Sequence, residues 1–392
     1  MPAQKMHDVA VIGAGPAGLA TALGLLARGI STALITGPER KADHRTTALL
    51  DGSVKILEGF GVWDKLKQAA APLRDMRIAD ATQRLVRAPE VTFRSAEIGL
   101  EAFGYNLEND VLRNALLQAA QERPGLTLLR TSLTSLETDA EGVTLHLAEG
   151  EPVRARLVAG ADGRSSIVRQ SAGISLRSRA YPQVAFTATV SHTRPHEDTS
   201  TEFHTPTGPF TLVPLPGDSS SIVCVVSEKD ASYLMSLDDA ALARELERRA
   251  FSILGAFTVR QGRGSFPLAA ETAISLHAPR IALLGEAAHI MPPIGAQGLN
   301  LGLRDAEALV DLVGKAVENG QDPGAPELLA RYERTRRSDI ENRMRAVDLL
   351  NRSLLSDFLP LQSVRGVGMY MLDRVGPLRR LLMRMGVGER AA

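Results

Sequence analysis

The sequence predicts an α/β protein in which a nucleotide-binding fold is interrupted by a sheet-rich insertion and followed by a helical C-terminal region. A strand, a glycine-rich turn, a helix and a second strand open the chain. Between residues 181 and 266 the composition shifts to β-branched and aromatic residues with proline and glycine between them. An apolar strand at 280–284, a Gly/Pro-rich loop and a long helix at 300–318 then resume the first pattern. At 392 residues the chain is long enough for two intertwined domains.

The opening unit has the layout of a dinucleotide-binding βαβ element. Residues 8–12 form the strand, GAGPAG at 13–18 forms the turn, and the helix and second strand follow at 19–28 and 31–35. Glycines at 13 and 15 let backbone N–H groups approach a pyrophosphate, and Gly18 lets the helix pack closely on the strand. The acidic residue that usually ends the second strand and binds the ribose is absent. Thr36 stands in its place and Glu39 is displaced.

The middle of the chain adds further elements. Apolar spacing predicts a helix at 109–122, alternation predicts one strand at 127–137, and a hairpin at 143–147 and 153–159 leads into a second glycine turn. The stretch 181–266 reads as mostly sheet with one helix near 238–251. These elements place the insertion between two parts of the nucleotide-binding fold.

Composition excludes several classes of protein. Lys and Arg number 45, as do Asp and Glu, which argues against a basic nucleic-acid-binding surface. The single cysteine, Cys224, has no partner for a disulfide or a metal site, so we expect a strand residue, no metal and a reducing compartment. No signal peptide and no apolar run of about 18 residues is found. We therefore expect a cytoplasmic protein that is soluble or peripheral at the inner face of the membrane.

Two further fingerprints reveal a family resemblance. The second is GADGRSSIVR at 160–169, and the third is GEAAHIMPPIGAQGLNLGLRDA at 285–306. With the first turn, their order and spacing over nearly the whole chain resemble the class A flavoprotein aromatic hydroxylases, such as para-hydroxybenzoate hydroxylase. GLNLGLRD at 298–305, RSDI at 337–340 and DLLNR at 348–352 are similar to the ubiquinone-synthesis branch of that family.

The resemblance implies a Rossmann-like FAD-binding domain of the para-hydroxybenzoate hydroxylase type, with an inserted mixed β-sheet substrate domain and a helical C-terminus. We expect the FAD-binding domain in three parts at 1–72, 108–175 and 267–320, the substrate domain at 73–107 and 176–266, and the helical region at 321–392.

The resemblance also implies roles for individual residues. Asp162 would hold the fold around FAD and the nicotinamide donor, and Glu286, in place of the usual aspartate, would bind the ribityl hydroxyls. Arg45 and Arg113 would approach the ribityl and phosphate groups; without the resemblance, both would be read as surface salt-bridge partners. The predicted FAD contacts are Gly13, Gly15, Ala17, Gly18, Arg45, Arg113, Asp162, Gly163, Glu286, Gly298, Leu299 and Asn300.

The third loop also has a physical rationale of its own. Reduced flavin carries negative charge near N1, and the helix that Gly298, Leu299 and Asn300 open presents unpaired N–H groups to that charge. Pro292 and Pro293 stiffen the preceding segment, which would suit a wall beside the reactive flavin C4a position.

The activity that the resemblance implies is FAD-dependent hydroxylation of the aromatic ring of a polyprenylphenol in ubiquinone biosynthesis. NADH or NADPH would reduce FAD, O2 would add at flavin C4a, and the flavin hydroperoxide would do the chemistry. No catalytic side chain is assigned; His289 is favoured as a packing residue rather than a base. The ring position, the exact substrate, the preferred nicotinamide and the oligomeric state are not specified by the sequence.

Several alternatives stay open at this point. The substrate could be a different phenol, or the chain could reduce isoprenoid double bonds on the same fold. The departures at Thr36 and Glu286 would also suit a non-catalytic scaffold in a quinone-synthesis complex. A flavin-dependent halogenase is excluded, because its Trp-x-Trp-x-Ile-Pro signature cannot occur in a chain with one tryptophan, Trp63. The Arg-rich apolar stretch 353–388 fits equally a helix packed on the body and a peripheral membrane face.

Overall fold

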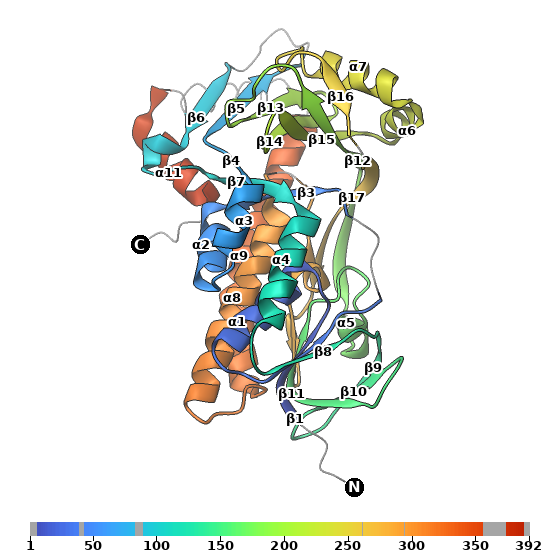
Figure 1. The fold of residues 1–392 in the computed structure, drawn as a ribbon, viewed down its shortest axis with the longest axis vertical. Coiled ribbons are helices and arrows are strands. Elements are labelled where there is room, and N and C mark those ends of the chain that lie inside the picture. Colours follow the sequence, from blue (N-terminus) through green and yellow to red (C-terminus); the bar gives the residue numbers. More distant parts are fainter. Residues whose placement is uncertain are drawn as a thin grey trace.

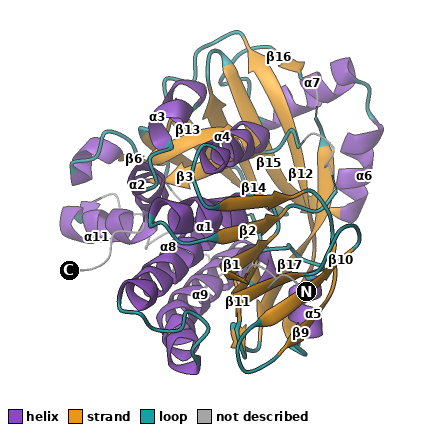
Figure 2. Cartoon of the chain, turned by 60° about the horizontal axis from the view of Figure 1, so that its bottom comes forward, coloured by secondary structure: helices purple, strands orange, loops and turns teal. Residues whose placement is uncertain are grey.

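The computed structural model describes residues 6–38, 43–82, 89–260, 262–293, 295–355 and 374–387. Its strands form three sheets of eight, nine and three strands. Figure 1 shows the second sheet at one end of the molecule, and the first sheet with its helices at the other. The predicted α/β architecture is confirmed, with the long helices gathered beside the first sheet (Figure 2).

The first sheet carries the opening unit. Its order is β18-β19-β11-β1-β2-β8, with β10 pairing β11 and β9 pairing β10. The central pairs are parallel, and the residues of β2 are all buried, as expected for a strand covered on both faces. The strands are β1 Met6–Ile12, β2 Thr32–Ile35, β8 Leu126–Leu129, β9 Leu133–Thr138, β10 Val143–Leu147, β11 Val153–Gly160, β18 His277–Ala278 and β19 Ile281–Leu283.

Helices far apart in the sequence cover this sheet. Helix α1 packs against both α4 and α8, and α8 packs against α9. The glycine turn, the central helix and the C-terminal helical region therefore belong to one core. The helices are α1 Pro16–Ala27, α4 Asn109–Gln121, α8 Gln297–Glu318 and α9 Pro326–Leu355, with the short α5 Ile167–Ser171 after the second glycine turn.

The second sheet is mainly antiparallel. Its order is β20-β17-β12-β15-β14-β13-β5-β6, with β16 pairing β12. One face packs against α6 and α7 through Phe186, Phe210, Leu234, Leu242 and Leu246. The elements are β5 Asp75–Asp80, β6 Val91–Arg94, β12 Leu176–His192, β13 Thr199–Thr205, β14 Gly208–Leu215, β15 Ser219–Ser227, α6 Glu228–Ser236, α7 Asp239–Arg249, β16 Phe257–Val259, β17 Gly264–Ala273 and β20 His289–Ile290.

A small third sheet lies between the two large ones. Its order is β3-β7-β4, and its strands are β3 Thr46–Leu50, β4 Ala71–Pro72 and β7 Gly104–Glu108. Helix α2 (Asp51–Gly59) follows β3 directly, and α3 (Trp63–Leu66) and the short 3-10 helices η1 (Lys67–Ala69), η2 (Ser95–Ile98) and η3 (Gly285–Ala287) complete the described elements.

The C-terminal stretch is only partly described, because 356–373 and 388 lie outside the described residues. Helix α11 (Gly376–Val387) packs through Met383 and Val387 onto Ile98 and Phe103. Its opposite side leaves Leu381, Leu382 and Met385 exposed. The described helix thus has one packed face and one exposed apolar face. None of the helices in the described ranges has the length and apolar character needed to cross a membrane.

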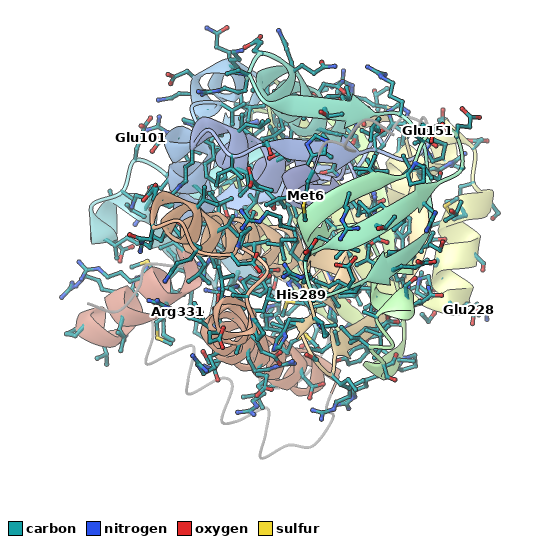
Figure 3. All side chains as sticks on the ribbon, turned by 90° about the horizontal axis from the view of Figure 1, so that it is seen from below. Met6, Glu101, Glu151, Glu228, His289 and Arg331 are labelled. Carbon is teal, nitrogen blue, oxygen red and sulfur yellow. The ribbon has the colours of Figure 1, made fainter. Side chains whose placement is uncertain are left out.

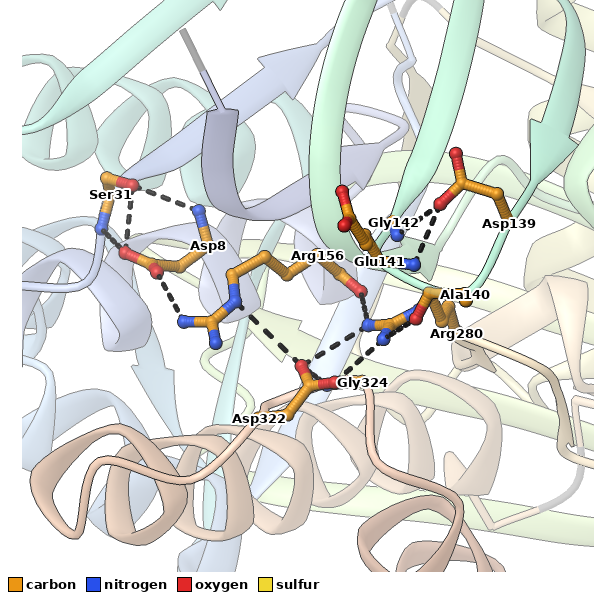
Figure 4. A network of polar contacts seen from close by, with 10 residues as sticks. All are labelled: Asp8, Ser31, Asp139, Ala140, Glu141, Gly142, Arg156, Arg280, Asp322 and Gly324. Carbon is orange, nitrogen blue, oxygen red and sulfur yellow. Dashed lines mark hydrogen bonds and ion pairs between the residues drawn. The ribbon is translucent and has the colours of Figure 1, made fainter.

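A network of polar contacts centred on arginines lies at the end of the first sheet opposite to the glycine turns (Figure 4). Arg280, in the left-handed region at φ +58°, donates to Arg156 O at 3.0 Å and to Asp322 Oδ2 at 2.8 Å. Asp8 binds Ser31 at the next strand, and Arg156 Nη1 lies 3.6 Å from Asp8 Oδ1. The network joins β1, β11, β19 and the α8–α9 connection.

Two sequence predictions are wrong in detail. The predicted strand at 127–137 is two strands, because the chain leaves β2 after Leu129 and pairs with β10 from Leu133. Residues 130–132 belong to neither strand, but no glycine or proline marks the break in the sequence. The second sheet also carries two helices rather than one. Ser227 caps α6 by accepting a hydrogen bond from Asp230 N at 3.1 Å. This serine cap is the sequence signal for the helix, which is too short to show a clear apolar periodicity.

Candidate functional site

The first and second glycine turns lie against each other. Gly13 has φ +112°, and a Cβ there would lie 2.3 Å from the carbonyl oxygen of Ala161. Ala161 N in turn donates to Ile12 O at 2.8 Å. Only glycine fits position 13, because the close approach and the backbone angle both exclude a side chain.

The N-terminus of α1 is left without a side-chain cap. Gly15 is the N-cap residue, Pro16 begins the helix, and the first turn carries no acidic residue. A Cβ at Gly15 would meet nothing within 4 Å, whereas a Cβ at Gly18 would lie 2.1 Å from Gly13 O. Gly18 is therefore required by the fold, and Gly15 borders open space beside free N–H donors that favour an anion.

The third glycine motif contacts the first one at Ala17. The Ala17 Cβ lies 3.2 Å from the point that a Cβ at Gly285 would occupy, and 3.3 Å from that of Gly302. Helix α8 begins at Gln297 after Ala296, which has φ +54°, and has no side-chain cap and no acidic residue in its first turn. A Cβ at Gly298 would meet nothing within 4 Å. The three motifs converge around two uncapped helix N-termini.

Carboxylates link the two predicted arginines, Arg45 and Arg113, at the rim of the glycine loops. Arg45 donates twice to Asp43, at 2.7 Å each, and its guanidinium carbon lies 5.2 Å from the Phe266 ring centre. Asp43 N donates to Asp110 Oδ2 at 2.8 Å, and Arg113 Nε lies 3.6 Å from Asp110 Oδ1. Arg113 is thus about a third exposed and paired within its own helix.

Glu286 contributes to the electrostatics of this rim. The hydrogen bonds to Asp43 raise the pKa of Arg45 above its ordinary value, and the negative charge of Glu286 adds to that shift. Glu286 itself is exposed on the short helix that follows Leu284. A carboxylate and a guanidinium from separate motifs therefore share the mouth of the glycine loops.

Asp162, Gly163 and Thr36 have internal roles. Asp162 accepts from Ser166 Oγ at 2.6 Å and from Val168 N at 3.1 Å, so it organises the turn into α5. Gly163 allows that turn with φ +80°. The hydroxyl of Thr36 donates to Gly37 O at 3.1 Å, which leaves only its acceptor capacity for a ligand. Glu39, the displaced acid, lies outside the described residues.

Asn300 and the two prolines shape the third loop. Asn300 is buried; its Oδ1 accepts from Leu50 N and its Nδ2 donates to Ala48 O, both at 2.8 Å. Its side chain therefore ties the start of α8 to β3, and only its backbone is left for a cofactor. Pro292 is buried and Pro293 is exposed.

Asp305 is a residue that the sequence reasoning missed. It is fully buried and accepts from Gly285 N at 3.0 Å and from Arg336 Nε at 2.7 Å, while its Oδ2 lies 2.6 Å from His289 Nε2. Burial alone would raise the pKa of Asp305, but His289 and Arg336 outweigh burial and hold it at about 2. The signal in the sequence is that Asp305 lies four residues after Leu301 and four before Leu309, on the apolar face of the helix, where a carboxylate requires buried partners.

His289 has the packing role that the sequence favoured. It lies toward the centre of the view in Figure 3, buried on β20 and bound to Asp305. Among the described residues its Nδ1 has no hydrogen-bond partner. The contacts of Asp305 with Gly285 and His289 fix the backbone on both sides of Glu286.

The geometry fits a dinucleotide cofactor. Space at Gly15 and Gly298 adjoins two helix N-termini with unpaired N–H groups, which suit a pyrophosphate and a negatively charged ring edge. Arg45 and Glu286 stand at the rim, where they would meet phosphate and hydroxyl groups respectively.

Comparisons with known proteins agree with this geometry. The family model described as FAD binding domain matches residues 6–347. The chain is 37% identical to the ubiquinone hydroxylase UbiL of Rhodospirillum rubrum, over 98% of this chain and 90% of that protein. It is 32% identical to the 3-demethoxyubiquinol 3-hydroxylase of Escherichia coli, over 97% and 98%. The structure of p-nitrophenol 4-monooxygenase PnpA from Pseudomonas putida superimposes with a TM-score of 0.81 at 19% identity, covering 99% of this chain and 100% of that one.

Proposed function

Because the chain belongs to the FAD-binding-domain family of flavin-dependent hydroxylases, we propose that it hydroxylates the aromatic ring of a polyprenylphenol during ubiquinone biosynthesis. The reaction consumes O2 and NADH or NADPH. The observation that carries the proposal is the meeting of Ala17 with Gly285 and Gly302, which brings the glycine motifs of a single FAD site together.

The residues of this chain bind and enclose the cofactor rather than react. Gly13, Gly15 and Gly18 leave room for the pyrophosphate at the start of α1, and Arg45 and Arg113 complement its charge. In this proposal Glu286, exposed beside Arg45, accepts from the ribityl hydroxyls. When bound, FAD accepts a hydride from the nicotinamide and activates O2 for transfer to the ring. The protein's task is to hold the phenol beside the flavin and to keep water out.

One face of the second sheet is turned toward the three glycine motifs, which we call the flavin loops, and this face supports a lipophilic substrate. Asn300 at the start of α8 binds Ala48 of β3, Ala48 pairs with Asn106 of β7, and Asn106 Nδ2 donates to Pro214 O at 2.8 Å and to Ser221 Oγ at 3.2 Å. The face that carries the Ser221 side chain is therefore turned toward the flavin loops.

We call this the flavin-side face. Strand register and alternation give it apolar side chains, among them Ala185, Val213, Leu215, Val223 and Val225, interspersed with serine and threonine side chains. The valine and leucine side chains of this face suit the prenyl group of a polyprenylphenol.

The direct test supplies purified, FAD-loaded protein with a short-chain prenylphenol, NADPH or NADH and labelled oxygen gas. One labelled oxygen atom in the product, found by mass spectrometry, supports hydroxylation. Reduction of a prenyl double bond without oxygen uptake would favour the reductase alternative. Colourless protein that binds no added FAD would favour a scaffold. Deletion of the gene in its host, with mass analysis of accumulated precursors, would identify the ring position.

We further propose peripheral membrane contact through α11. Its outer side combines exposed Leu381, Leu382 and Met385 with basic residues, and the helix contains no acidic residue. Such a face suits an anionic bilayer that holds the lipophilic substrate.

Flotation with phosphatidylglycerol vesicles tests membrane contact. A double substitution, Leu381→Asp with Leu382→Asp, is expected to abolish binding, while Leu349→Asp, at an exposed leucine of α9, is the matched control. Equal flotation of both variants would refute the role of α11.

A further inference from the structure

The flavin-side face carries an ionisable pair, Glu202 and His204. Glu202 on β13 pairs in register with Thr211 on β14, and Thr211 pairs with Val223 on β15. Glu202 therefore projects from the same face as Val223, and His204, two residues further along β13, does so as well. Successive side chains on one face of a strand are spaced by roughly 7 Å.

The pair is closely coupled and largely hidden from solvent. His204 Nε2 lies 2.9 Å from Glu202 Oε1, and the hydroxyl of Thr211 donates to Glu202 Oε2 at 3.4 Å. The side chain of His204 is 7% exposed and that of Glu202 is 22% exposed. Glu202 is thus the member that keeps accessible surface, and His204 lies behind it.

Burial of two ionisable groups costs desolvation free energy. The interior of a fold rarely requires such a pair, and a hydrogen-bonded acid and base on a face turned toward a cofactor site can serve proton transfer. None of the cofactor contacts described above uses Glu202 or His204. The substrate that belongs on this face is a phenol, which has one proton that can be transferred.

We propose that Glu202 accepts the hydrogen bond and then the proton of the substrate's phenolic hydroxyl, with His204 as its positioning residue. This inference rests on the proposed function. The phenolic O–H bond breaks, an O–H bond forms on the Glu202 carboxylate, and the electron pair stays on the phenolate oxygen. The phenolate enriches the ring in electrons, which would favour C–O bond formation with one oxygen atom of O2 activated on the loaded FAD. The O–O bond breaks, the second oxygen atom leaves as water, and the nicotinamide supplies the two electrons. The proton of the substituted ring carbon leaves to water, and Glu202 returns its own proton to the product oxygen.

Among the described residues, Asp80 also flanks the pair. Asp80 of β5 lies opposite His204 in register and accepts from Thr82 N at 2.9 Å. Any ionisation seen in a pH profile must therefore be assigned with variants, rather than from the shape of the profile alone.

The first test measures binding without turnover. A prenyl-substituted nitrophenol, whose phenolate absorbs visible light, is titrated into the FAD-loaded protein below the phenol's own pKa. The unsubstituted protein is expected to induce the phenolate band, and Glu202→Gln is expected to bind the probe mainly as the neutral phenol. Induction of the band by Glu202→Gln to the same extent overturns the proposal. This readout needs no oxygen transfer, so it stands or falls separately from the proposed function.

The second test measures catalysis. Glu202→Gln is expected to lower kcat for an ordinary prenylphenol by about 100-fold or more, while FAD binding is unchanged. A fluorinated prenylphenol that is already ionised at the assay pH should restore most of that loss. His204→Gln should give a smaller loss and shift the acidic limb of the kcat pH profile. A fluorinated phenol that rescues neither variant would contradict proton acceptance at Glu202.

A matched control uses the His–Glu contact on the first sheet. Glu137 lies 3.6 Å from His146 and its side chain is 81% exposed. Glu137→Gln removes the same carboxylate from a similar pair far from the cofactor loops, and neither the phenolate band nor kcat should change. A loss in Glu137→Gln equal to that in Glu202→Gln would mean that the effect is one of general charge, and would overturn the proposal.

Discussion

Two glycines in the first turn should respond in opposite ways to the same added methyl group. Gly15 has φ −76° and ψ 166°, angles that alanine adopts freely, and its Cβ would meet no protein atom within 4 Å. Gly18 has a normal helical backbone, but its Cβ would lie 2.1 Å from Gly13 O. Gly15→Ala should therefore affect the cofactor, and Gly18→Ala should affect the fold.

The magnitudes follow from these contacts. In the apo protein, Gly15→Ala loses a favourable N-cap residue but also restricts the unfolded chain, and the two effects of under about 1 kcal/mol each nearly cancel. With FAD, the new methyl group pushes the pyrophosphate away from charged hydrogen bonds, at a cost of about 2 kcal/mol, or roughly 30-fold in Kd. Gly18→Ala forces a backbone shift that should lower the free energy of unfolding by about 1–3 kcal/mol.

Both quantities are measurable on the same preparations. FAD affinity is obtained from the quenching of flavin fluorescence by apo protein, and stability from urea unfolding of the apo protein. If Gly15→Ala binds FAD as tightly as the unsubstituted chain, the pyrophosphate does not lie at this turn. If Gly18→Ala unfolds at the same urea concentration as the unsubstituted chain, the close packing of α1 on the turn is wrong.

Three other predictions follow from buried or networked groups. Arg280→Ala should lower the free energy of unfolding by about 2–3 kcal/mol in urea without changing FAD affinity, whereas Arg345→Ala, at an exposed arginine of α9, should change it by less than about 0.5 kcal/mol. The pKa of Asp305 is lowered from 3.8 to about 2, so its stabilising effect is fully present above pH 3.8 and is lost as the pH falls through about 2. That effect is worth about 2 kcal/mol, and urea unfolding of Asp305→Asn should lack this part of the acid dependence. Asn300→Ala leaves Leu50 N without its buried acceptor and should cost about 1–3 kcal/mol and weaken FAD binding; unchanged stability and affinity would show that the start of α8 is held by other contacts.

Local sequence patterns were enough to predict the main secondary-structure elements and the class of cofactor. Three glycines after an apolar strand encode a turn that only a backbone without Cβ can make, and the structure places Gly13 and Gly18 at such approaches. The boundaries of α1, α4 and α8 also followed closely from apolar spacing and from the glycines and proline at their ends. Local steric rules of this kind need no information about distant residues.

The tertiary structure alone decided which distant residues meet. Nothing in the local pattern shows that Asp305 binds Gly285 N and Arg336. Nor does it show that Asn300 ties α8 to β3, or that both carboxylate oxygens of Asp162 accept hydrogen bonds at the start of α5. The same holds for Glu202 and His204, because alternation gives each strand two faces but not the face that looks toward the flavin loops. Which face is buried, and against what, depends on packing between segments far apart in the sequence, such as those of Leu50 and Asn300, which are 250 residues apart.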